Sequence, residues 1–445
     1  MLGLTSRPSG PLADYDQVLP LLDGTGPESW REKRERAYRR FTEFGVPSLK
    51  DEEFRYVPLR VLEDAPFAPA YGATVDRNQL ASTLTGKIDA ITLAFVNGQY
   101  APELSSADSL PDGVVVMPLD EAALMLPNEV DAHLGRIADL SGRLGTTNDE
   151  RFVDLNTAYL GEGAYVHIPR GVVLVRPVHL VFLNQADHGP FAVYPRTLVV
   201  VEDGAQAKVI ESHLGRQGVY FTNAVTEVFL GRDALLEHAL VQDETSDSVH
   251  LATIAIHQSH GSNYQGHNAN FGGKVVRKEV NVWLDGEHTE TWLNGANVGN
   301  DNQVIDNHTR IDHAKPNCHS FEVYKSVLAD RSTGVFNGKI FVYEDAQKTD
   351  AKQTNQALLL SPHATMNTKP QLEIFADDVK CTHGATIGQL RDDSLFYLRA
   401  RGIPLKEAQG LLVYAFAAEV LERITMDDLR EALEARLFDK LAEVR

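Results

Sequence analysis

Apolar residues in the middle of the chain come in short runs and not in long periodic stretches. From residue 149 to 390 these runs include "AYVHIPRGVVLV", "TLVVVEDGAQAKVI", "HLATIAIHQSHG" and "KEVNVWLDG", and Gly, Asn or Asp breaks nearly every one. Runs of this length bounded by turn residues predict β-strands, and no convincing amphipathic helix separates them. We therefore expect the segment 149–390 to be a mainly β body.

The strand runs show no strict repeat, so their spacing fits a barrel, a sandwich or a strand solenoid. Two polar stretches, "GSNYQGHNANFGG" and "NGANVGNDNQVIDNHTRID", favour the solenoid. Asparagine tolerates a left-handed backbone and can hydrogen-bond to its equivalent in the next turn, so we interpret these stretches as Asn-rich corners. The sequence thus favours a parallel β-helix.

The first 148 residues mix helical and strand patterns. Trp30, Ala37, Phe41 and Phe44 recur at about helical spacing within "SWREKRERAYRRFTEFGVP", which predicts a helix with charged residues on its outer side. Further on, "ITLAFVNGQY" predicts a buried strand that runs into an Asn-Gly turn. We expect a helical and mixed domain over residues 1–148.

Residues 391–445 return to a helical pattern. The stretch "KEAQGLLVYAFAAEVLERI" is apolar on nearly all sides, as in a packed helix, and Leu429, Leu433, Leu437 and Leu441 form a stripe along the next predicted helix. A stripe of this kind is most often part of a core, and near a chain end it is also a candidate for docking a partner. We expect a C-terminal helical domain here.

Charge and composition narrow the class of protein. The 445 residues include 42 Lys and Arg against 62 Asp and Glu, a formal net charge of −20, which disfavours nucleic acid and anionic lipid as partners. The start "MLGLTSRPSGPLADYD" has no secretory pattern, and no apolar run approaches the ~20 residues of a membrane span. Cys318 and Cys381 are too few for a disulfide framework. These features predict a soluble cytoplasmic protein.

The familiar catalytic motifs are missing from the sequence. It contains no GxxxxGK[ST] phosphate loop, no GxSxG elbow, no HExxH pair and no CxxC pair. Histidine is plentiful, with 16 in all. The cluster His308, His313, Cys318 and His319 nevertheless matches no standard zinc spacing, so we expect these four to be structural. The pattern therefore does not point to an enzyme.

One short motif, Cys381-Thr382-His383, can bring two metal-binding side chains together. In a strand, residues i and i+2 point to the same face about 6.5–7 Å apart, so a thiolate and an imidazole there can converge on one soft or borderline metal. Two ligands do not close a site, which predicts an open site or one shared across an interface. A lone Cys-x-His is also common at ordinary strand ends.

The direction in which Cys381 points does not follow from alternation alone. In "LEIFADDVKCTHG" the apolar residues Leu372, Ile374 and Ala376 share a face with Asp378 and Lys380. Either the strand leaves the core at this point or a bulge resets its register.

Beyond these local patterns, long stretches resemble a known family. Residues 324–390, "YKSVLADRSTGVFNGKIFVYEDAQKTDAKQTNQALLLSPHATMNTKPQLEIFADDVKCTHGATIGQL", closely resemble the core signature of the SufB/SufD family of iron–sulfur cluster assembly proteins. The stretches "FYLRARGIPLKEAQGLLVYAFAAEVL", "KDEEFRYVPL", "FVNGQY" and "LNTAYLGEGAYVHIPRGVVLVRPVHLVF" continue the resemblance, which covers most of the chain.

The resemblance implies a right-handed parallel β-helix between helical terminal regions, and a non-catalytic scaffold. Cys381-Thr382-His383-Gly384 resembles the SufD branch of the family, whereas SufB members carry a Glu-containing stretch there. A SufD-type chain would pair with a SufB-like subunit through the last β-helix strands. A SufC-like ATPase would dock on the C-terminal helices, from about 395 to 445, and would supply the nucleotide hydrolysis that this chain lacks.

By the same resemblance, His383 matches the histidine that faces the partner where a nascent iron–sulfur cluster forms. Cys381 matches the neighbouring cysteine. The cluster would be held transiently and shared, with the remaining ligands supplied by the partner. Because terminal strands of a solenoid are exposed edges, the isolated chain could also pair with itself as a homodimer.

Two other classes compete with this interpretation. A carbohydrate-active β-helix enzyme would be expected to carry a secretory signal and a groove of catalytic residues. A purely structural solenoid would bind partners without any metal. Replacing Cys381 and His383 separates the structural solenoid from the cluster scaffold.

Overall fold

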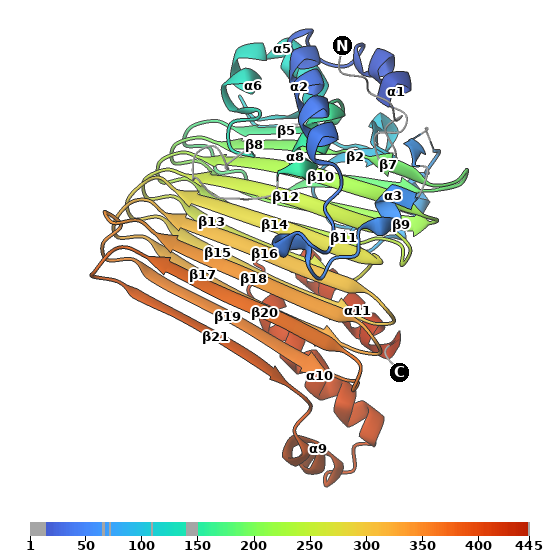
Figure 1. Ribbon diagram of the computed structural model, residues 1–445, viewed down its shortest axis with the longest axis vertical. Helices are drawn as coiled ribbons and strands as arrows, with labels where there is room; N and C mark the ends of the chain where they lie inside the picture. Colours follow the sequence, from blue (N-terminus) through green and yellow to red (C-terminus); the bar gives the residue numbers. More distant parts are fainter. Residues whose placement is uncertain (1–14, 65–66, 71–72, 108–109, 139–149, 444–445) are drawn as a thin grey trace.

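The computed structural model describes residues 15–64, 67–70, 73–107, 110–138 and 150–443. Its body is a parallel β-solenoid in which the chain passes back and forth between two facing sheets, with helices at both chain ends (Figure 1). The predicted parallel β-helix between helical flanks is confirmed. No described helix is long and apolar enough to cross a membrane.

The elements before the solenoid are short helices and strands. In chain order they are α1 Tyr15–Leu22, α2 Ser29–Phe44, η2 Glu52–Phe54, α3 Arg60–Asp64, β1 Ala68–Pro69, α4 Arg77–Ala81, β2 Ile91–Val96, β3 Gln99–Tyr100, η3 Pro102–Leu104, β4 Val115–Pro118, α5 Leu119–Met125, α6 Pro127–His133 and α8 Arg151–Ala158.

The solenoid strands alternate between two sheets, here named sheet A and sheet B. Sheet A contains β4 and, in spatial order, β5 Gly163–Ile168, β8 Arg196–Val201, β10 Tyr220–Leu230, β12 Val249–Gln258, β14 Val275–Leu284, β16 Val304–His313, β18 Thr333–Val342 and β20 Thr365–Ile374. In addition, β7 Phe191–Val193 pairs with β10, and β1 pairs with β7. Sheet B contains β3, β2, β6 Val178–Gln185, β9 Gln206–Gln217, β11 Leu235–Asp243, β13 Asn263–Asn270, β15 Glu290–Gly299, β17 His319–Leu328, β19 Asp350–Leu359 and β21 Lys380–Gly388. Three helices follow: α9 Asp392–Arg399, α10 Leu405–Leu421 and α11 Asp427–Glu443.

Each turn of the solenoid places one strand in register on the strand of the turn before. His319 of β17 pairs with Asp350 of β19, and Asp350 pairs with Lys380 of β21, so one turn spans about 30 residues. Side chains that are register partners lie on the same face of the sheet, because parallel neighbours share the same pleat. Columns of side chains therefore run along the lumen and along each outer face.

The Asn-rich corners predicted above are present only in part, since residues 300–303 form a corner between β15 and β16 that includes Asn300 and Asn302. Most residues in "GSNYQGHNANFGG" and "NGANVGNDNQVIDNHTRID" lie within β13, β15 and β16. Asn270 Nδ2 donates to Asn297 Oδ1 at 2.8 Å, and Asn297 Nδ2 donates to Ser326 Oγ at 3.1 Å, so these amides bridge successive strands and not corners. The corners from sheet A to sheet B instead place these residues at positive φ: Gly204, Asp233, Gly261, His288, Asn317 and Lys348.

Helices cover the two outer faces of the solenoid. On sheet A, α1, α2 and η2 pack against outward apolar residues such as Phe221, Leu251 and Val275. Within α2 the predicted apolar side is mostly confirmed, except that Phe44 is exposed and Arg34 is buried in its place. The predicted Asn-Gly hairpin is present as β2 and β3, and β2 extends sheet B beside β6.

The C-terminal helices α10 and α11 lie on the outer face of sheet B, behind the strands in Figure 1. The leucine stripe of α11 belongs to this core, since Leu429, Leu433 and Leu437 are buried against outward residues of sheet B such as Ala269. The stripe is thus part of the core of the monomer. In contrast, α9 projects from the end of the molecule and buries none of its side chains (Figure 1).

Candidate functional site

The strand that carries Cys381 and His383, β21, is the last of sheet B. It pairs with β19 on one side, and no described strand pairs with its other side. Seven of its nine residues are exposed, in contrast to the almost fully buried β5 and β6 near the other end of the solenoid. The candidate residues therefore lie at an open sheet edge.

Cys381 points into the end of the lumen. Its register partner is Ala351, which is fully buried, and its side chain packs with a small cluster that includes Ile340 and Ala376. The direction of Cys381 could not be predicted from alternation because a corner interrupts the strand. β20 ends at Ile374, and β21 begins at Lys380 in the other sheet. Burial raises the pKa of the Cys381 thiol, helped by the nearby Asp350 carboxylate, although the Ala351 backbone contact lowers it. The thiol is therefore protonated at neutral pH until a metal or a cation displaces its proton.

His383 lies two residues further along the same strand and on the same face. Its register partner is Gln353, which is only 2% exposed and faces the lumen. His383 itself is exposed because no further turn covers it. The structure thus brings Cys381 and His383 to one face, as the i, i+2 spacing predicts.

A polar column runs inward from His383 along the lumen side of sheet B. Glu322 of β17 and Gln353 of β19 are successive register partners in this column, followed by His383. Gln353 Nε2 donates to Glu322 Oε2 at 2.9 Å, and Thr309 Oγ1 donates to the same oxygen at 3.0 Å. Burial raises the pKa of Glu322 to about 7, against the lowering effect of these two hydrogen bonds. Sequence analysis missed this column, because its members are about 30 residues apart.

The pair has the right chemistry for iron but is incomplete. Thiolate and imidazole are suitable ligands for iron and for other borderline metals. Among the residues that the structure describes, however, no group of three or more His, Cys, Asp or Glu side chains is arranged to hold a metal ion. Cys381 and His383 would therefore need further ligands from outside the described chain.

In the stretch from His308 to His319, three of the four candidate side chains have structural partners. His308 contacts Asp306 at 3.0 Å and Glu53 at 3.3 Å. His313 Nε2 lies 2.9 Å from Ser320 Oγ, and burial lowers the pKa of His313 to about 3. Cys318 Sγ contacts the Gly286 carbonyl at 3.2 Å. Each of these side chains has a partner within the solenoid wall.

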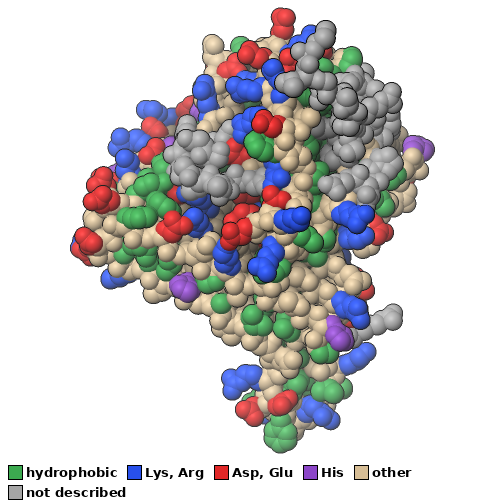
Figure 2. Space-filling view, viewed as in Figure 1, with side chains coloured by type: hydrophobic (Ala, Val, Ile, Leu, Met, Phe, Trp, Pro, Cys, Tyr) green, Lys and Arg blue, Asp and Glu red, His purple; other side chains and the backbone are tan. Residues whose placement is uncertain are grey.

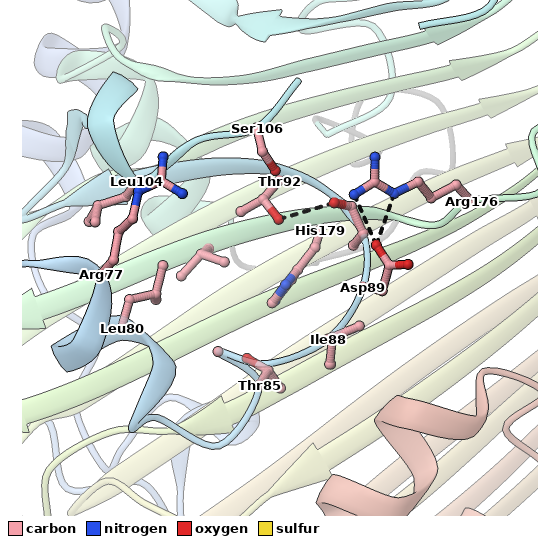
Figure 3. A pocket seen from close by; sticks show the side chains of 13 residues that line it. Arg77, Leu80, Thr85, Ile88, Asp89, Thr92, Leu104, Ser106, Arg176 and His179 are labelled. Atoms are coloured by element: carbon pink, nitrogen blue, oxygen red, sulfur yellow. Dashed lines mark hydrogen bonds and ion pairs between the residues drawn. The ribbon is translucent and has the colours of Figure 1, made fainter. Parts of the chain in front are cut away.

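A cleft of about 210 Å³ lies elsewhere, between α4, β2 and β6 (Figure 3). His179 sits at its base, 2.8 Å from Ser212 Oγ, and burial lowers the pKa of His179 to about 3, so the ring is neutral. At the rim, Arg176 is paired with Asp89 at 2.9 Å. The strand β6 is seven strand spacings from β21 in sheet B, roughly 33 Å at the usual spacing. The cleft is thus separate from Cys381 and His383.

Exposed apolar side chains gather on the projecting C-terminal helices. Phe396 and Tyr397 of α9 are 75% and 55% exposed, and Leu405 and Leu411 of α10 are both 45% exposed. Figure 2 shows apolar side chains beside charged ones on the narrow projection at the lower end of the molecule. A single exposed leucine needs no explanation, but apolar residues along two successive helices can bind a partner.

Comparisons with known proteins agree with this architecture. Residues 182–416 match the family model of the SUF system FeS cluster assembly SufBD core domain, and residues 13–180 match the SufBD protein N-terminal region. The chain is 34% identical to an iron–sulfur cluster assembly SufBD family protein of Synechocystis sp., over 93% of this chain and 91% of that protein. It is 32% identical to the iron–sulfur cluster assembly protein SufD of Escherichia coli, over 89% of this chain and 90% of that protein.

A more distant relative, the SufD protein of Bacillus subtilis, is 26% identical over 81% of this chain and 84% of that protein. The two family models together span residues 13–180 and 182–416, which include nearly all of the solenoid but not α11. On this basis, the chain belongs to the SufBD family of iron–sulfur cluster assembly proteins.

Proposed function

We propose that this chain is a SufD-type scaffold subunit that pairs with a SufB-like subunit through β20 and β21. The observation that carries the proposal is the open end of the solenoid, where β21 presents both an unpaired edge and His383. An exposed parallel edge offers a row of free backbone groups to a partner strand. Cytoplasmic location and a non-catalytic role belong to the same proposal.

The nascent iron–sulfur cluster, the cargo of the assembly, would form at this edge. His383 would contribute one ligand and Cys381 a second, once its proton is displaced. The partner would supply the remaining ligands, which accounts for the incomplete set in this chain. No nucleotide would be bound by the chain itself.

A SufC-like ATPase would dock at the C-terminal end. The segment 391–445 would serve as the docking domain, next to the β-helix of 149–390 and the N-terminal domain of 1–148. Because the leucine stripe of α11 is already buried, the docking surface would be α9 and the exposed side of α10. Phe396 and Tyr397 are the largest exposed apolar side chains there.

The proposal is tested by co-expressing the chain with SufB-like and SufC-like partners and purifying the complex without oxygen. Bound iron and sulfide are then measured for the unmodified chain, His383→Ala and Cys381→Ser. We expect the complex to form in all three cases, with most of the iron and sulfide lost in His383→Ala and a smaller loss in Cys381→Ser. His363, in the corner before β20, provides a control, since His363→Ala removes a histidine outside the candidate pair.

Two outcomes would contradict the proposal. If His383→Ala retains full iron and sulfide, this end of the solenoid is an architectural contact without a role in cluster chemistry. If the chain forms a stable homodimer that excludes the SufB-like partner, the open edge serves self-association.

A further inference from the structure

The side-chain amide of Gln353 makes a hydrogen bond through its nitrogen but not through its oxygen. Its Nε2 donates to Glu322 Oε2 at 2.9 Å, which fixes the amide in the lumen. Its Oε1 is buried and has no hydrogen-bond partner among the described residues. A buried carbonyl oxygen without a donor is unfavourable in free energy, so such an atom calls for an explanation.

The unsatisfied oxygen lies one strand away from His383. Gln353 and His383 are direct register partners on β19 and β21, and both face the lumen. The oxygen and nitrogen of an amide diverge from the same carbon. Because the nitrogen points back to Glu322 on β17, the oxygen is turned away from that strand. His383 is next in register and exposed, but it does not donate to this oxygen in the described conformation, so its ring must turn toward the lumen for the two to bond.

The opposite sheet leaves room for this amide. Gly338 of β18 faces Gln353 across the lumen, and a Cβ atom built on Gly338 would lie 2.0 Å from Gln353 Nε2. Any larger residue at 338 would displace the amide. The glycine, Thr309 and Glu322 therefore hold Gln353 in one position.

We propose that Gln353 is a positioning residue for His383: when the exposed ring turns toward the lumen, the side-chain oxygen of Gln353 accepts a hydrogen bond from one ring N–H and leaves the other ring nitrogen free for iron. Metal-binding histidines usually donate their second ring N–H to a carbonyl or carboxylate, which fixes the tautomer and the ring orientation. This inference rests on the proposed function, because it assigns Gln353 a role toward the same iron.

The chain offers a matched control two residues further along β19. Asn355 is as buried as Gln353, faces the lumen and also has an unpartnered side-chain oxygen. Its Nδ2 donates to Thr368 Oγ1 at 3.1 Å, and its register partner is Ala385, which cannot donate from its side chain. Replacing Asn355 therefore tests the effect of altering a lumen amide alone.

The first measurement is the tautomer of His383 in the isolated full-length chain, labelled with ¹⁵N-histidine and assigned with His383→Ala. At pH 8.5 we expect one dominant tautomer in the unmodified chain and in Asn355→Leu, and a mixture of both in Gln353→Met. Gln353→Met keeps the length of the side chain but removes its oxygen. Should Gln353→Met fail to fold, Gln353→Asn retracts the amide by one methylene and is expected to act in the same direction.

The second measurement is the affinity of the three-protein complex for Fe²⁺, by competition with a chelator. We expect Gln353→Met to weaken iron binding about 10-fold, the lower end of the range for residues that orient a ligand. Asn355→Leu should change it less than about 2-fold by the same reasoning.

The outcomes separate this inference from the proposed function. An unchanged tautomer in Gln353→Met, an unchanged iron affinity, or an equal effect of Asn355→Leu would overturn the role of Gln353. If instead His383→Ala leaves iron binding intact, the proposed function fails, and the tautomer measurement still decides whether Gln353 holds the His383 ring.

Discussion

The two ends of the solenoid are finished in opposite ways. At the first end, β4 and β3 pair antiparallel with β5 and β2 and so stop both parallel ladders. Helices α5 and α6 then pack over this end against β5 and β8. At the other end β20 and β21 stop with no described strand or helix over their edges, and most of β21 is exposed.

The difference supports our proposal that a partner binds at the open end. Repeat structures need capping elements at their ends, because each repeat buries its neighbour, and an exposed parallel edge invites further pairing. This chain has a cap of its own at one end. The uncapped end carries the sequence feature with metal-binding chemistry, which is why we place the partner there.

The largest loss of stability is expected when the buried ion pair near the closed end is removed. Arg196 Nη2 and Glu227 Oε2 form a buried ion pair at 2.6 Å, and Glu227 also accepts the backbone N–H groups of Gly135 at 2.8 Å and Ile137 at 3.1 Å. Burial alone would raise the pKa of Glu227, but Arg196 and these N–H groups hold it below its usual value. Arg196→Met leaves a buried carboxylate unpaired and should lower the free energy of unfolding by about 3–5 kcal/mol.

Urea unfolding measures this effect, and an exposed pair nearby provides the control. Arg170 and Asp203 form a bridge at 3.1 Å in which the arginine side chain is 76% exposed. Arg170→Met should therefore cost less than about 1 kcal/mol. Equal losses for the two variants would show that Glu227 does not tie the closed end together.

A smaller effect on stability is expected from the ionisation of Glu322 in the polar column near the open end. Burial raises the pKa of Glu322 from an ordinary 4.5 to about 7, so the folded chain binds a proton there more tightly than the unfolded chain does. Stability should therefore fall as the pH rises from about 4.5 to 7 and stay lower above that window. Glu322→Gln removes the ionisation and should stabilise the chain by roughly 1–3 kcal/mol at pH 8, with the gain disappearing near pH 4.

Urea unfolding of Glu322→Gln and of the unmodified chain at pH 4, 6 and 8 tests this sign. Glu287→Gln is a suitable control, because Glu287 is an exposed corner residue. A variant that is less stable than the unmodified chain at pH 8 would contradict the expectation.

A substitution at the free edge of β21 is expected to have the smallest effect on stability and a clear effect on association with a partner. Lys380 N–H donates to the Thr349 carbonyl on the β19 side. Because N–H groups alternate sides in a parallel strand, that of Thr386 also points to β19, and that of Ala385 points to the free edge. Ala385→Pro should cost below about 1 kcal/mol of stability and weaken binding of a SufB-like partner at least about 10-fold.

The neighbouring substitution sharpens this test. Thr386→Pro removes a bond to β19 and should loosen the strand itself, which amide hydrogen exchange detects. If Ala385→Pro binds the partner normally, measured by analytical ultracentrifugation, the edge is not the pairing surface.

How far the sequence predicts this molecule depends on how local each signal is. The α2 helix and the β2–β3 hairpin follow from residues a few positions apart, and both are confirmed. Arg34 was missed because its partner is distant: its Nε donates to the Leu160 carbonyl at 2.6 Å, and the sequence gives no sign of that pairing. Phe44 is exposed because α2 ends at this residue.

The solenoid was predicted correctly, but partly for a wrong reason. Its asparagines form amide bridges between strands, and the left-handed corners are occupied by residues as different as Asp233, His288 and Lys348. Corner conformation is imposed by stacking on the next turn, as in the bond from Lys348 N–H to the Asp378 carbonyl. Local sequence preference carries little of that information.

At the candidate site the sequence predicts the shared face of Cys381 and His383 but not its direction. The direction depends on a corner between Ile374 and Lys380, and the alternating pattern of the sequence wrongly predicts a continuous strand there. Gln353 and Glu322 depend on the register of strands whose spacing varies, from 29 residues between Glu290 and His319 to 31 between His319 and Asp350. An irregular period hides such columns until the strands are aligned in space.

The number of stacked turns also sets the length of the solenoid. Each turn of about 30 residues adds one strand to each sheet, so the number of turns fixes how far the closed end stands from His383. Adjacent strands are about 4.8 Å apart, and a turn inserted or deleted in the middle would change that length in steps of this size. Neither end need change its own contacts. The length of the solenoid can therefore change independently of the structure of its two ends.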